Sequence, residues 1–539
     1  MLKRRVWRPI ATVVFTITLI ASAFFMISLL NADLLPAKYL LLVVAAFAVF
    51  LFTAGFLLFY RMRKKRSMMR RVRRIIGVIL CVLITAGSVY GTVLFMNAHN
   101  FFKDITSKSD DQPRSIVRVY VRNDDPAQSI SDMADYRFAV LGQYDDEIID
   151  SNYAISKINE TLNSEVDAAS YPDIASAAEA IRSGDAQALA VSSVYIDTLD
   201  NTESYKAFSD EIRPIDEISV PRSATLANTP IVIKSDMPKV EVTPKPTPEP
   251  TPEPTPEPTP EPPVYGEDTT LVFYLSGTDK WEEGVSNTHN DVNMLMLVNT
   301  KTRQVLLIHT PRDYYLTNAK KNAYDKLAYC GISGMDNTIA TLEKFFGIKI
   351  DKYVKVNFSG FMTFVDGIGG ITIDNPVAFH TAIPSHSYDF PAGEIELDGP
   401  AALAYARERH SFANGELGRG QNHLRVLTAI INRLRSGGVT LMMQYPKILG
   451  LMGDCLETDL SSDQISDLIK IAAQYLNDWD IKSYGLFGAS GKGHVATSGT
   501  DEYFIWPNQH SVEFAERLMT MIQNDEIITD EVLAEAPRY

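Results

Sequence analysis

The apolar residues of this chain follow two different patterns. In the first hundred residues they form three long runs, Val6–Leu30, Leu35–Tyr60 and Ile75–Met96. Each run is near or above the roughly 20 residues that a helix needs to cross a bilayer. Beyond these runs, short apolar stretches alternate with amphipathic ones, which is typical of α/β domains. The pattern therefore predicts a membrane region at 1–98 with three transmembrane helices, followed by folded domains.

Basic residues near the N-terminus predict how the three helices cross the membrane. Residues 1–74 carry 14 Lys and Arg but one acid, and nine of the basic residues lie in the loop 61–74. The loop 31–38 carries one basic and one acidic residue. The positive-inside rule then places the N-terminus and the loop 61–74 in the cytoplasm, and everything after about residue 97 outside the cell membrane.

The same charge distribution excludes some functions. The whole chain has a formal charge of −15, so residues 75–539 are strongly acidic and we expect no nucleic-acid partner. No Asp, Glu, Lys or Arg interrupts the middle of a membrane span, which disfavours a transporter or proton pump. The three cysteines show no metal-binding spacing, and the sequence leaves open whether Cys330 and Cys455 pair.

Residues 99–237 predict a small extracellular α/β accessory domain. The stretch holds no cluster of histidines, cysteines or paired carboxylates, so we interpret it as an accessory or spacer domain without chemistry of its own. The expected strands are Ser115–Val121, Arg137–Gly142, Ala188–Ile196, Glu211–Val220 and Ile231–Lys234, and the expected helices are Ile148–Leu162 and Asp173–Ser183.

A proline-rich linker follows at residues 238–264. Its TPEP repeats place proline at alternate positions, which favours an extended polyproline II chain. At ~3.1 Å per residue the repeat region reaches about 65 Å. We expect such a linker to act as a stiff spacer that lifts the next domain away from the lipid surface.

Residues 265–539 show the pattern of a second, larger α/β domain. We interpret Gly488–Thr500, which contains GASGKGH, as a surface loop, because it lacks the spacing of a phosphate-binding loop. Strands are expected at Thr270–Ser276, Val292–Val298, Val305–His309 and Tyr353–Asn357, and helices at Asn337–Phe346, Ser359–Val365, Gly399–Tyr405, Asn422–Ser436, Ser462–Leu476 and His510–Ile522.

Charged residues stand where the predicted strands of this domain end. Asp279 follows the first strand, Asp291 precedes the second, and Arg312 follows the third, which Pro311 stops. Two carboxylates at neighbouring strand ends suit Mg²⁺, which takes few protein oxygens and leaves its other positions to water or phosphate. An arginine held at a strand end is well placed to bind an anion.

Three further arginines extend this set. Arg407 and Arg409 lie two residues apart, so an extended chain would point both to one side, and Arg419 follows a glycine-containing loop. Guanidinium groups bind phosphate oxygens bidentately and neutralise charge as a phosphoester bond breaks. Each residue alone is compatible with an ordinary turn or surface position, but together with the two aspartates they predict a site for a pyrophosphate.

The order of these motifs resembles the LytR-CpsA-Psr (LCP) family over about Thr270–Arg435. The resemblance is closest to the streptococcal CpsA-like capsule attachment proteins, which also have three membrane spans and an extra outer domain. It implies an α/β/α catalytic domain with a central mixed sheet. The motifs are GTD at 277–279, an Asp entering a strand at 291, TPRD at 310–313, VDGIGG at 365–370, LDGPAALAYARER at 397–409 and the later Arg419.

The resemblance also implies a function, that of a glycopolymer–peptidoglycan phosphotransferase. The family uses Mg²⁺ to move a polyprenyl-pyrophosphate-linked glycopolymer, such as capsule polysaccharide or teichoic acid, onto a peptidoglycan hydroxyl through a phosphodiester. Carried over to this chain, it makes Asp279 and Asp291 the metal ligands. The implied pyrophosphate-binding residues are Arg312, Arg407, Arg409 and Arg419, and the implied catalytic set is Asp279, Asp291, Arg312, Arg407 and Arg409.

The family holds the lipid tail in an apolar pocket of the catalytic domain. The apolar helices around Phe358–Phe364 and Leu424–Ile431 are the candidates for this pocket. Ordinary core packing explains their apolarity equally well.

Three positions depart from the family pattern. His289 stands where members usually have an arginine, and Asn422 and His423 stand where they tend to have an Arg and a Gln. Histidine can still donate a hydrogen bond to phosphate, but it is only partly charged at pH 7. We therefore expect His289 and His423 to contact the pyrophosphate. A polymer head group or a pH response that differs from that of other members, and a reduced activity, are the alternatives that these replacements leave open.

Two other functions stay open at this point. The same site could hydrolyse polyprenyl pyrophosphate with water as acceptor, or the chain could be a non-catalytic, membrane-anchored regulator of the cell envelope. The complete set of aspartates and arginines argues against the second of these. The spacing does not select a general base among Asp291, Glu416 and His423.

Overall fold

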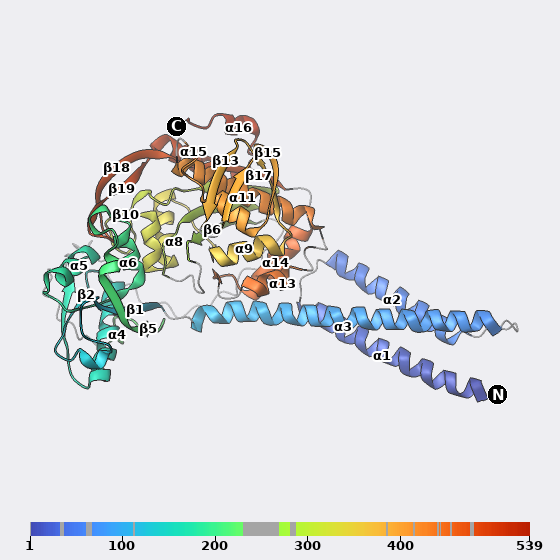
Figure 1. The fold of residues 1–539 in the computed structure, drawn as a ribbon. Coiled ribbons are helices and arrows are strands. Elements are labelled where there is room, and N and C mark those ends of the chain that lie inside the picture. Colours follow the sequence, from blue (N-terminus) through green and yellow to red (C-terminus); the bar gives the residue numbers. More distant parts are fainter. Residues whose placement is uncertain are drawn as a thin grey trace, which may run out of the picture.

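The computed structural model describes most of the chain and places it in three regions (Figure 1). The described residues are 2–32, 37–60, 67–111, 114–229, 269–280, 287–383, 386–412, 415–438, 441, 444–452, 455–474 and 479–538. The predicted linker, 238–264, and the predicted strand Ile231–Lys234 lie outside them. All three cysteines are free.

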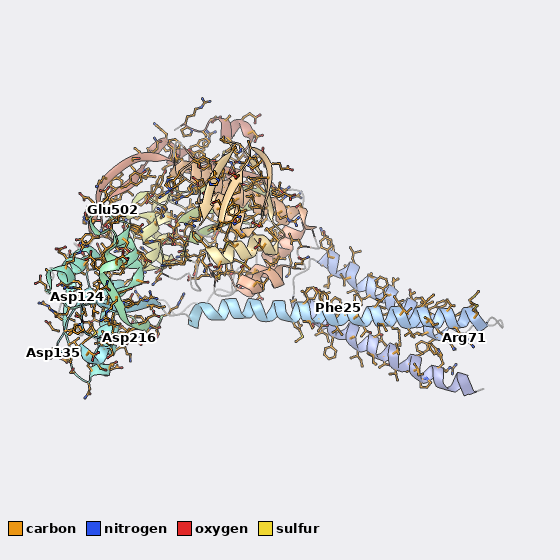
Figure 2. All side chains as sticks on the ribbon, in the orientation of Figure 1. Phe25, Arg71, Asp124, Asp135, Asp216 and Glu502 are labelled. Carbon is orange, nitrogen blue, oxygen red and sulfur yellow. The ribbon has the colours of Figure 1, made fainter. Side chains whose placement is uncertain are left out.

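Three N-terminal helices, α1 (Leu2–Ala32), α2 (Ala37–Phe59) and α3 (Ser67–Asp111), are long and apolar enough to cross a membrane. The N-terminus and Arg71 lie at the end of this bundle that points away from the folded domains (Figures 1 and 2). Helix α3 has 45 residues and continues beyond its apolar segment, which ends at Met96. The predicted boundary at residue 98 therefore falls inside a helix that leads directly to the next domain.

The accessory domain is a five-stranded sheet with helices packed on it. Its sheet order is β3-β2-β4-β1-β5, with β1 antiparallel to both neighbours. The predicted strand Ala188–Ile196 is wrong in its second half, because Ser193 begins helix α6; a short apolar run does not distinguish a strand from a buried helix. The elements are β1 (Ser115–Arg122), β2 (Arg137–Leu141), α4 (Asp145–Leu162), β3 (Asp167–Tyr171), α5 (Ile174–Ser183), β4 (Ala188–Ser192), α6 (Ser193–Asp200) and β5 (Ile212–Val220).

The large domain is built on a six-stranded mixed sheet with the order β16-β11-β6-β7-β8-β17. The pairs β11–β6 and β8–β17 are parallel and the others are antiparallel. The strands of this sheet are β6 (Thr270–Thr278), β7 (Val292–Asn299), β8 (Gln304–His309), β11 (Lys352–Asn357), β16 (Leu456–Thr458) and β17 (Asp480–Gly485).

Helices cover both faces of this sheet, because alternate strand residues point to opposite faces. Val272 and Tyr274 pack toward α8 (Met335–Phe346) and α15 (Gln509–Gln523), whereas Leu271 and Phe273 pack toward α14 (Ser462–Gln474). The α/β/α architecture with a central mixed sheet is thus confirmed. The other helices are α7 (Leu327–Cys330), α9 (Phe358–Gly367), α10 (Gly399–Arg407), α11 (Glu416–Ser436), α13 (Tyr445–Met452) and α16 (Asp530–Ala534).

Small two-stranded sheets surround this core, and one of them corrects a prediction. The segment Gly488–Val495, expected as part of a surface loop, is strand β18, which pairs with β19 (Thr500–Pro507). A Cβ at Gly491 would come within 2.3 Å of the Phe504 ring, so the glycine lets the hairpin lie over this aromatic side chain. The remaining strands are β9 (Tyr315–Thr317), β10 (Tyr324–Lys326), β12 (Ile371–Asn375), β13 (Phe379–Ile383), β14 (His386–Phe390) and β15 (Gly393–Leu397).

The large domain lies against the membrane helices. Helix α13 contacts α3, and Ile465 and Ile469 of α14 pack on an apolar cluster that contains Phe25 and Leu29. Figure 2 shows Phe25 in the part of the bundle nearer the folded domains. The domain is therefore held next to the helices, and not displaced from them as the linker composition had suggested.

The accessory domain shares a core with the large domain. Tyr195, Ile196 and Leu199 of α6 belong to the same buried cluster as Tyr329 and Ile332. A buried ion pair joins Lys321 to Glu147, with 3.3 Å between Nζ and Oε1. Two domains that share buried apolar and charged contacts form one packed unit.

This interface predicts a large effect of one substitution. Glu147→Ala leaves the buried Lys321 ammonium without its nearest carboxylate, and we expect the free energy of unfolding to fall by about 3 kcal/mol. Denaturant unfolding of the purified full chain measures it. The matched control is Glu203→Ala, which removes the exposed interdomain pair between Glu203 and Lys492 and should cost less than about 1 kcal/mol. Equal losses in both variants would contradict the buried pair.

Candidate functional site

Two aspartates meet at one edge of the central sheet. Asp279 follows β6 and Asp291 precedes β7, and these two strands are antiparallel neighbours. The Asp279 N–H donates to Asp291 Oδ2 (3.2 Å), and the Asp291 N–H donates to the Gly277 carbonyl (2.8 Å). The pKa of Asp279 is raised, chiefly by restricted solvation and secondly by the negative charge of Asp291. The two carboxylates therefore lie close enough to repel each other.

Arg312 is the direct partner of this pair. Its Nη1 donates to Asp291 Oδ1 at 2.6 Å, and its Nε lies 3.7 Å from Asp313 on the other side. Burial, the largest single influence, would raise the pKa of Asp291, but the charge and hydrogen bond of Arg312, together with His289 and Arg419, hold that pKa below its ordinary value. Asp313 is thus close enough to act on Arg312 through its charge, while the hydrogen bond that holds the guanidinium comes from Asp291.

Arg407 and Arg419 converge on the same edge from α10 and α11. Partial burial lowers the pKa of Arg407, with Asp279 and Asp291 acting in the opposite sense and the charge of Arg419 acting in the same sense. The Arg407 guanidinium lies over the Phe358 ring, 4.6 Å from its centroid. Electrostatic influence of this kind requires proximity, so both guanidinium groups share one region with the aspartates.

Glu416 fixes Arg419 in the first turn of α11. Both Glu416 oxygens accept hydrogen bonds from Arg419 Nη2 at 2.5 Å, and the two side chains are 14% and 11% exposed. The charge of Glu416 also raises the pKa of Arg312. Glu416 therefore pairs with Arg419 and lies near enough to act on Arg312 through its charge.

Arg409 is not brought to the aspartates by any contact among the described residues. Its Nε donates to His410 Nε2 at 3.4 Å. Arg407 and Arg409 are both exposed while Glu408 between them is buried, but Arg407 ends helix α10, so the extended chain expected over the two arginines does not include it. A role of Arg409 in binding pyrophosphate stays a prediction.

His289 contacts the accessory domain instead of facing open solvent. Its Nε2 lies 2.9 Å from Thr198 Oγ1 of α6, and its ring packs on Tyr329 with 5.2 Å between the ring centroids. Burial lowers the pKa of His289 to about 4. The ring is therefore neutral at pH 7 and does not supply the positive charge of the arginine that the family pattern has at this position.

His423 and Asn422 point into the protein. His423 is buried, with Nδ1 3.3 Å from His309 Nε2 and a further hydrogen bond to the Ala406 backbone, and burial lowers its pKa well below the ordinary value. Asn422 donates to the Tyr405 carbonyl at 2.9 Å. The structure thus places His423 behind Arg419, and a contact of His423 with pyrophosphate stays a prediction.

Sequence reasoning missed several polar residues beside the site. Lys355 on β11 is fully buried, donates to the Thr288 carbonyl at 3.4 Å, and has its pKa lowered to about 8 by burial. Lys280 pairs with Asp197 of the accessory domain at 2.7 Å. The position of Lys355 in an otherwise ordinary strand was the one available signal, while Asp197 and Thr198 gave none because they belong to another domain.

The residues present fit a hard divalent cation. The Asp279 side chain is exposed beside Asp291, and the repulsion between the two carboxylates is the kind that a bound cation relieves. No group of three or more His, Cys, Asp or Glu that could enclose a metal ion occurs among the described residues. Mg²⁺ is commonly bound by one or two carboxylates, with water molecules and the phosphate oxygens of the substrate as its other ligands.

An apolar cavity of about 390 Å³ lies on the face of the sheet that α11 and α14 cover. Phe364 and Ile431 line it, so each of the two helices proposed for a lipid pocket contributes a side chain. Other lining residues come from the sheet and from α14, and include Phe273, Leu275, Met296, Val298, Ile465 and Ile469.

Comparison with known proteins gives one family. Residues 250–519 match the LytR_cpsA_psr family. A protein of Oceanobacillus iheyensis named polyisoprenyl-teichoic acid–peptidoglycan teichoic acid transferase TagU is 30% identical over 213 residues, or 38% of this chain and 64% of that protein. A protein of Enterococcus faecalis with the same name is 32% identical over 203 residues, or 37% and 64%. The chain thus spans 64% of the length of these two relatives.

A similar solved structure is the crystal structure of TagV from B. subtilis. It is 23% identical to this chain and covers 49% of this chain and 100% of that one, with a TM-score of 0.41.

The two buried histidines behind the site predict a loss of stability in acid. Burial lowers the pKa of His309 to about 3, and the pKa of His423 is also depressed. Below about pH 6.5 these histidines are protonated in the unfolded chain but stay neutral in the folded chain. The free energy of unfolding therefore falls as the pH drops below about 6.5. At pH 5 the burial of neutral His309 should cost about 2 kcal/mol relative to pH 7, and His423 acts in the same direction.

Thermal unfolding at pH 7 and pH 5 measures this effect. His423→Gln should show a smaller decrease in Tm between the two pH values than the wild type, because glutamine does not protonate. His510→Gln, at a histidine whose side chain is 83% exposed, is the control and should behave as the wild type does. A decrease of the same size in all three proteins would show that the buried histidines are not responsible.

Proposed function

The chain belongs to the LytR-CpsA-Psr family, and on that premise we propose that it transfers a polyprenyl-pyrophosphate-linked glycopolymer onto peptidoglycan through a phosphodiester. The observation that carries the proposal is the convergence of Asp279, Asp291 and Arg312 at one sheet edge with Arg407 and Arg419 beside them. Such a set suits a multiply charged phosphate and has no evident use in a purely structural protein. The names of the two relatives support teichoic acid as the polymer class. Capsule polysaccharide is also proposed as a substrate, because it is linked to its lipid through the same pyrophosphate group.

The proposed reaction is a phosphoryl transfer. An acceptor hydroxyl oxygen on peptidoglycan attacks the phosphorus atom that carries the glycan, and the bond from that phosphorus to the bridging oxygen breaks. Polyprenyl monophosphate leaves with the bridging oxygen, and the hydroxyl proton passes to a base. The enzyme mainly positions the two substrates and neutralises charge, because the pyrophosphate is already activated.

The arginines bind and orient the pyrophosphate in this scheme. Arg312 is held by its hydrogen bond to Asp291, and Arg419 by Glu416, so both guanidinium groups are oriented before substrate binds. Asp279 and Asp291 would hold Mg²⁺, which when bound neutralises charge on the phosphate oxygens. Asp291, Glu416 and His423 stay the candidates for the base; Asp291 pairs with Arg312, Glu416 with Arg419, and His423 with His309.

The apolar cavity is proposed to hold the lipid tail. It lies on a face of the same sheet whose edge carries the charges, and polar residues contribute little to its walls. Burial of polyprenyl carbons there would contribute about 0.8 kcal/mol for each CH₂ group. We place the site on the outer side of the cell membrane, with the N-terminus in the cytoplasm. The N-terminus and Arg71, which belong to the two basic stretches of the sequence, lie at the end of the bundle away from the folded domains.

The first prediction concerns Arg312. Purified full-length protein, given a polyprenyl-pyrophosphate-linked polymer, Mg²⁺ and peptidoglycan fragments, should form a polymer–peptidoglycan conjugate. Arg312→Ala should reduce the rate at least 100-fold, because it removes a phosphate ligand and leaves Asp291 unpaired. The control is Arg517→Ala, which removes an exposed ion pair with Glu535. Release of polyprenyl phosphate without conjugate would identify a hydrolase instead. Full conjugation by Arg312→Ala would contradict the role of Arg312, and wild-type protein that forms neither product would support the non-catalytic alternative.

The second prediction concerns the cavity. Leu275→Trp fills part of it, so binding of a long-chain polyprenyl pyrophosphate should weaken at least tenfold, while binding of a pyrophosphate with a short prenyl chain should change less than twofold. Isothermal titration with the two ligands measures this difference. Val377→Trp adds the same side chain at an exposed position and is the control. Equal weakening for both ligands would contradict the cavity as the lipid site.

A further inference from the structure

Helix α6 of the accessory domain touches both residues that flank the aspartate pair. Figure 1 shows α6 on the side of the accessory domain that faces the large domain. Asp197 Oδ2 accepts from Lys280 Nζ at 2.7 Å, and Lys280 directly follows Asp279. Thr198 Oγ1 lies 2.9 Å from His289 Nε2, and His289 is two residues from Asp291. Two consecutive residues of one helix thus contact both sides of the candidate metal site.

The Thr198 contact fixes the tautomer of His289. The Thr198 hydroxyl has one hydrogen, which it donates to the Val194 carbonyl at 2.7 Å within its own helix. The hydroxyl oxygen therefore accepts from His289, so we assign the proton of the ring to Nε2. The lone pair is then on Nδ1, and His289 has no further N–H to donate to a phosphate.

The Lys280 ammonium makes its ion pair with Asp197 and not with the neighbouring Asp279. The two residues are neighbours in sequence, and a lysine stem is long and flexible enough for its ammonium group to reach a nearby carboxylate. The Lys280 backbone is also held, because its carbonyl accepts from the Phe358 N–H at 3.1 Å. With the ammonium group drawn toward Asp197, the Asp279 carboxylate is left for a cation.

A third connection runs through the backbone. Ala328 of α7 is buried in the core that the two domains share. Its N–H donates to the Arg312 carbonyl at 2.8 Å, and its carbonyl accepts from the Asn290 N–H at 3.0 Å. One residue of the domain interface, Ala328, is thus hydrogen-bonded to the backbone of Arg312 and to the backbone next to Asp291, and it fixes the distance between these two segments.

The placement of α6 is enforced by packing. Tyr195, Ile196 and Leu199 are buried with Tyr329, and Tyr195 donates from its hydroxyl to Glu147, the carboxylate that also pairs with Lys321. Side chains held in a close-packed core keep their positions to within small displacements. Helix α6 therefore holds Asp197 and Thr198 in fixed positions next to the site.

We propose that the accessory domain contributes positioning residues to the transferase site. Asp197 positions Lys280, and Thr198 positions His289. Asp197 keeps Lys280 from competing with the divalent cation for Asp279. Thr198 fixes the ring of His289 and, through it, the segment that leads into Asp291. The proposal rests on the transferase function proposed above, and the experiments separate the two.

The first experiment measures metal binding by the full chain in detergent, with Mn²⁺ followed by electron paramagnetic resonance. Asp197→Ala should weaken Mn²⁺ binding about fivefold or more, because the freed Lys280 ammonium pairs with Asp279. The double variant Asp197→Ala/Lys280→Met should recover most of the affinity, since the competing charge is gone. Glu203→Ala, which removes another ion pair between the domains, is the control and should bind as the wild type does.

The second experiment measures hydrogen exchange of the segment 287–293. Thr198→Val removes the hydroxyl with little change in shape, and exchange there should become at least tenfold faster, with transfer reduced about tenfold. Thr161→Val is the matched control, because Thr161 makes the same hydrogen bond to the carbonyl four residues earlier, on an exposed face of α4. It should change neither quantity.

The outcomes are distinct. Wild-type protein that forms no conjugate would overturn the transferase function, and the exchange rates in Thr198→Val and Thr161→Val would still decide whether α6 positions the segment. Mn²⁺ affinity in Asp197→Ala equal to that in Glu203→Ala, or no recovery in the double variant, would overturn the role of Asp197. Equal exchange in the two threonine variants would overturn the role of Thr198.

Discussion

The ion pair between Arg312 and Asp291 is the interaction on which the arrangement of the site depends. It joins the end of β8 to the start of β7, and its charges lie in a partly buried position where neither group would be stable alone. The backbone on each side is fixed by hydrogen bonds, from Asp291 to Gly277 and from Ala328 to Arg312. A carboxylate and a guanidinium held in this way keep their charges without needing a bound substrate.

Two helices connect this charged edge to the apolar cavity. Helix α11 carries Arg419 in its first turn and contributes Ile431 to the cavity further along, and α9 carries Phe358 under Arg407 and Phe364 at the cavity wall. The two chemically different parts of a lipid pyrophosphate would therefore be bound by opposite ends of the same rigid elements. A displacement of either helix would change both binding regions together.

The three departures from the family pattern share one structural property, which is that each has a partner inside the protein. His289 is bonded to Thr198, Asn422 to the Tyr405 carbonyl and His423 to His309. Close packing accompanies the last of these, because a Cβ at Gly420 would lie 2.5 Å from the His309 ring. These side chains are thus held by contacts to the interior and, for His289, to the accessory domain.

The sequence by itself determined the membrane helices, the α/β/α class, and the positions of Asp279, Asp291 and Arg312 at strand ends, because hydrophobic period and strand-stopping residues are local signals. It did not determine that Gly488–Val495 is a strand. This glycine-rich segment pairs with β19, where its glycines leave room for the Phe504 ring, and the sequence does not show which segment it meets. It could not separate Arg407 from Arg409, or show that His423 faces His309, because the direction of a side chain depends on packing. Only the tertiary structure brought Asp197 and Thr198, about 90 residues away in sequence, to the aspartate pair.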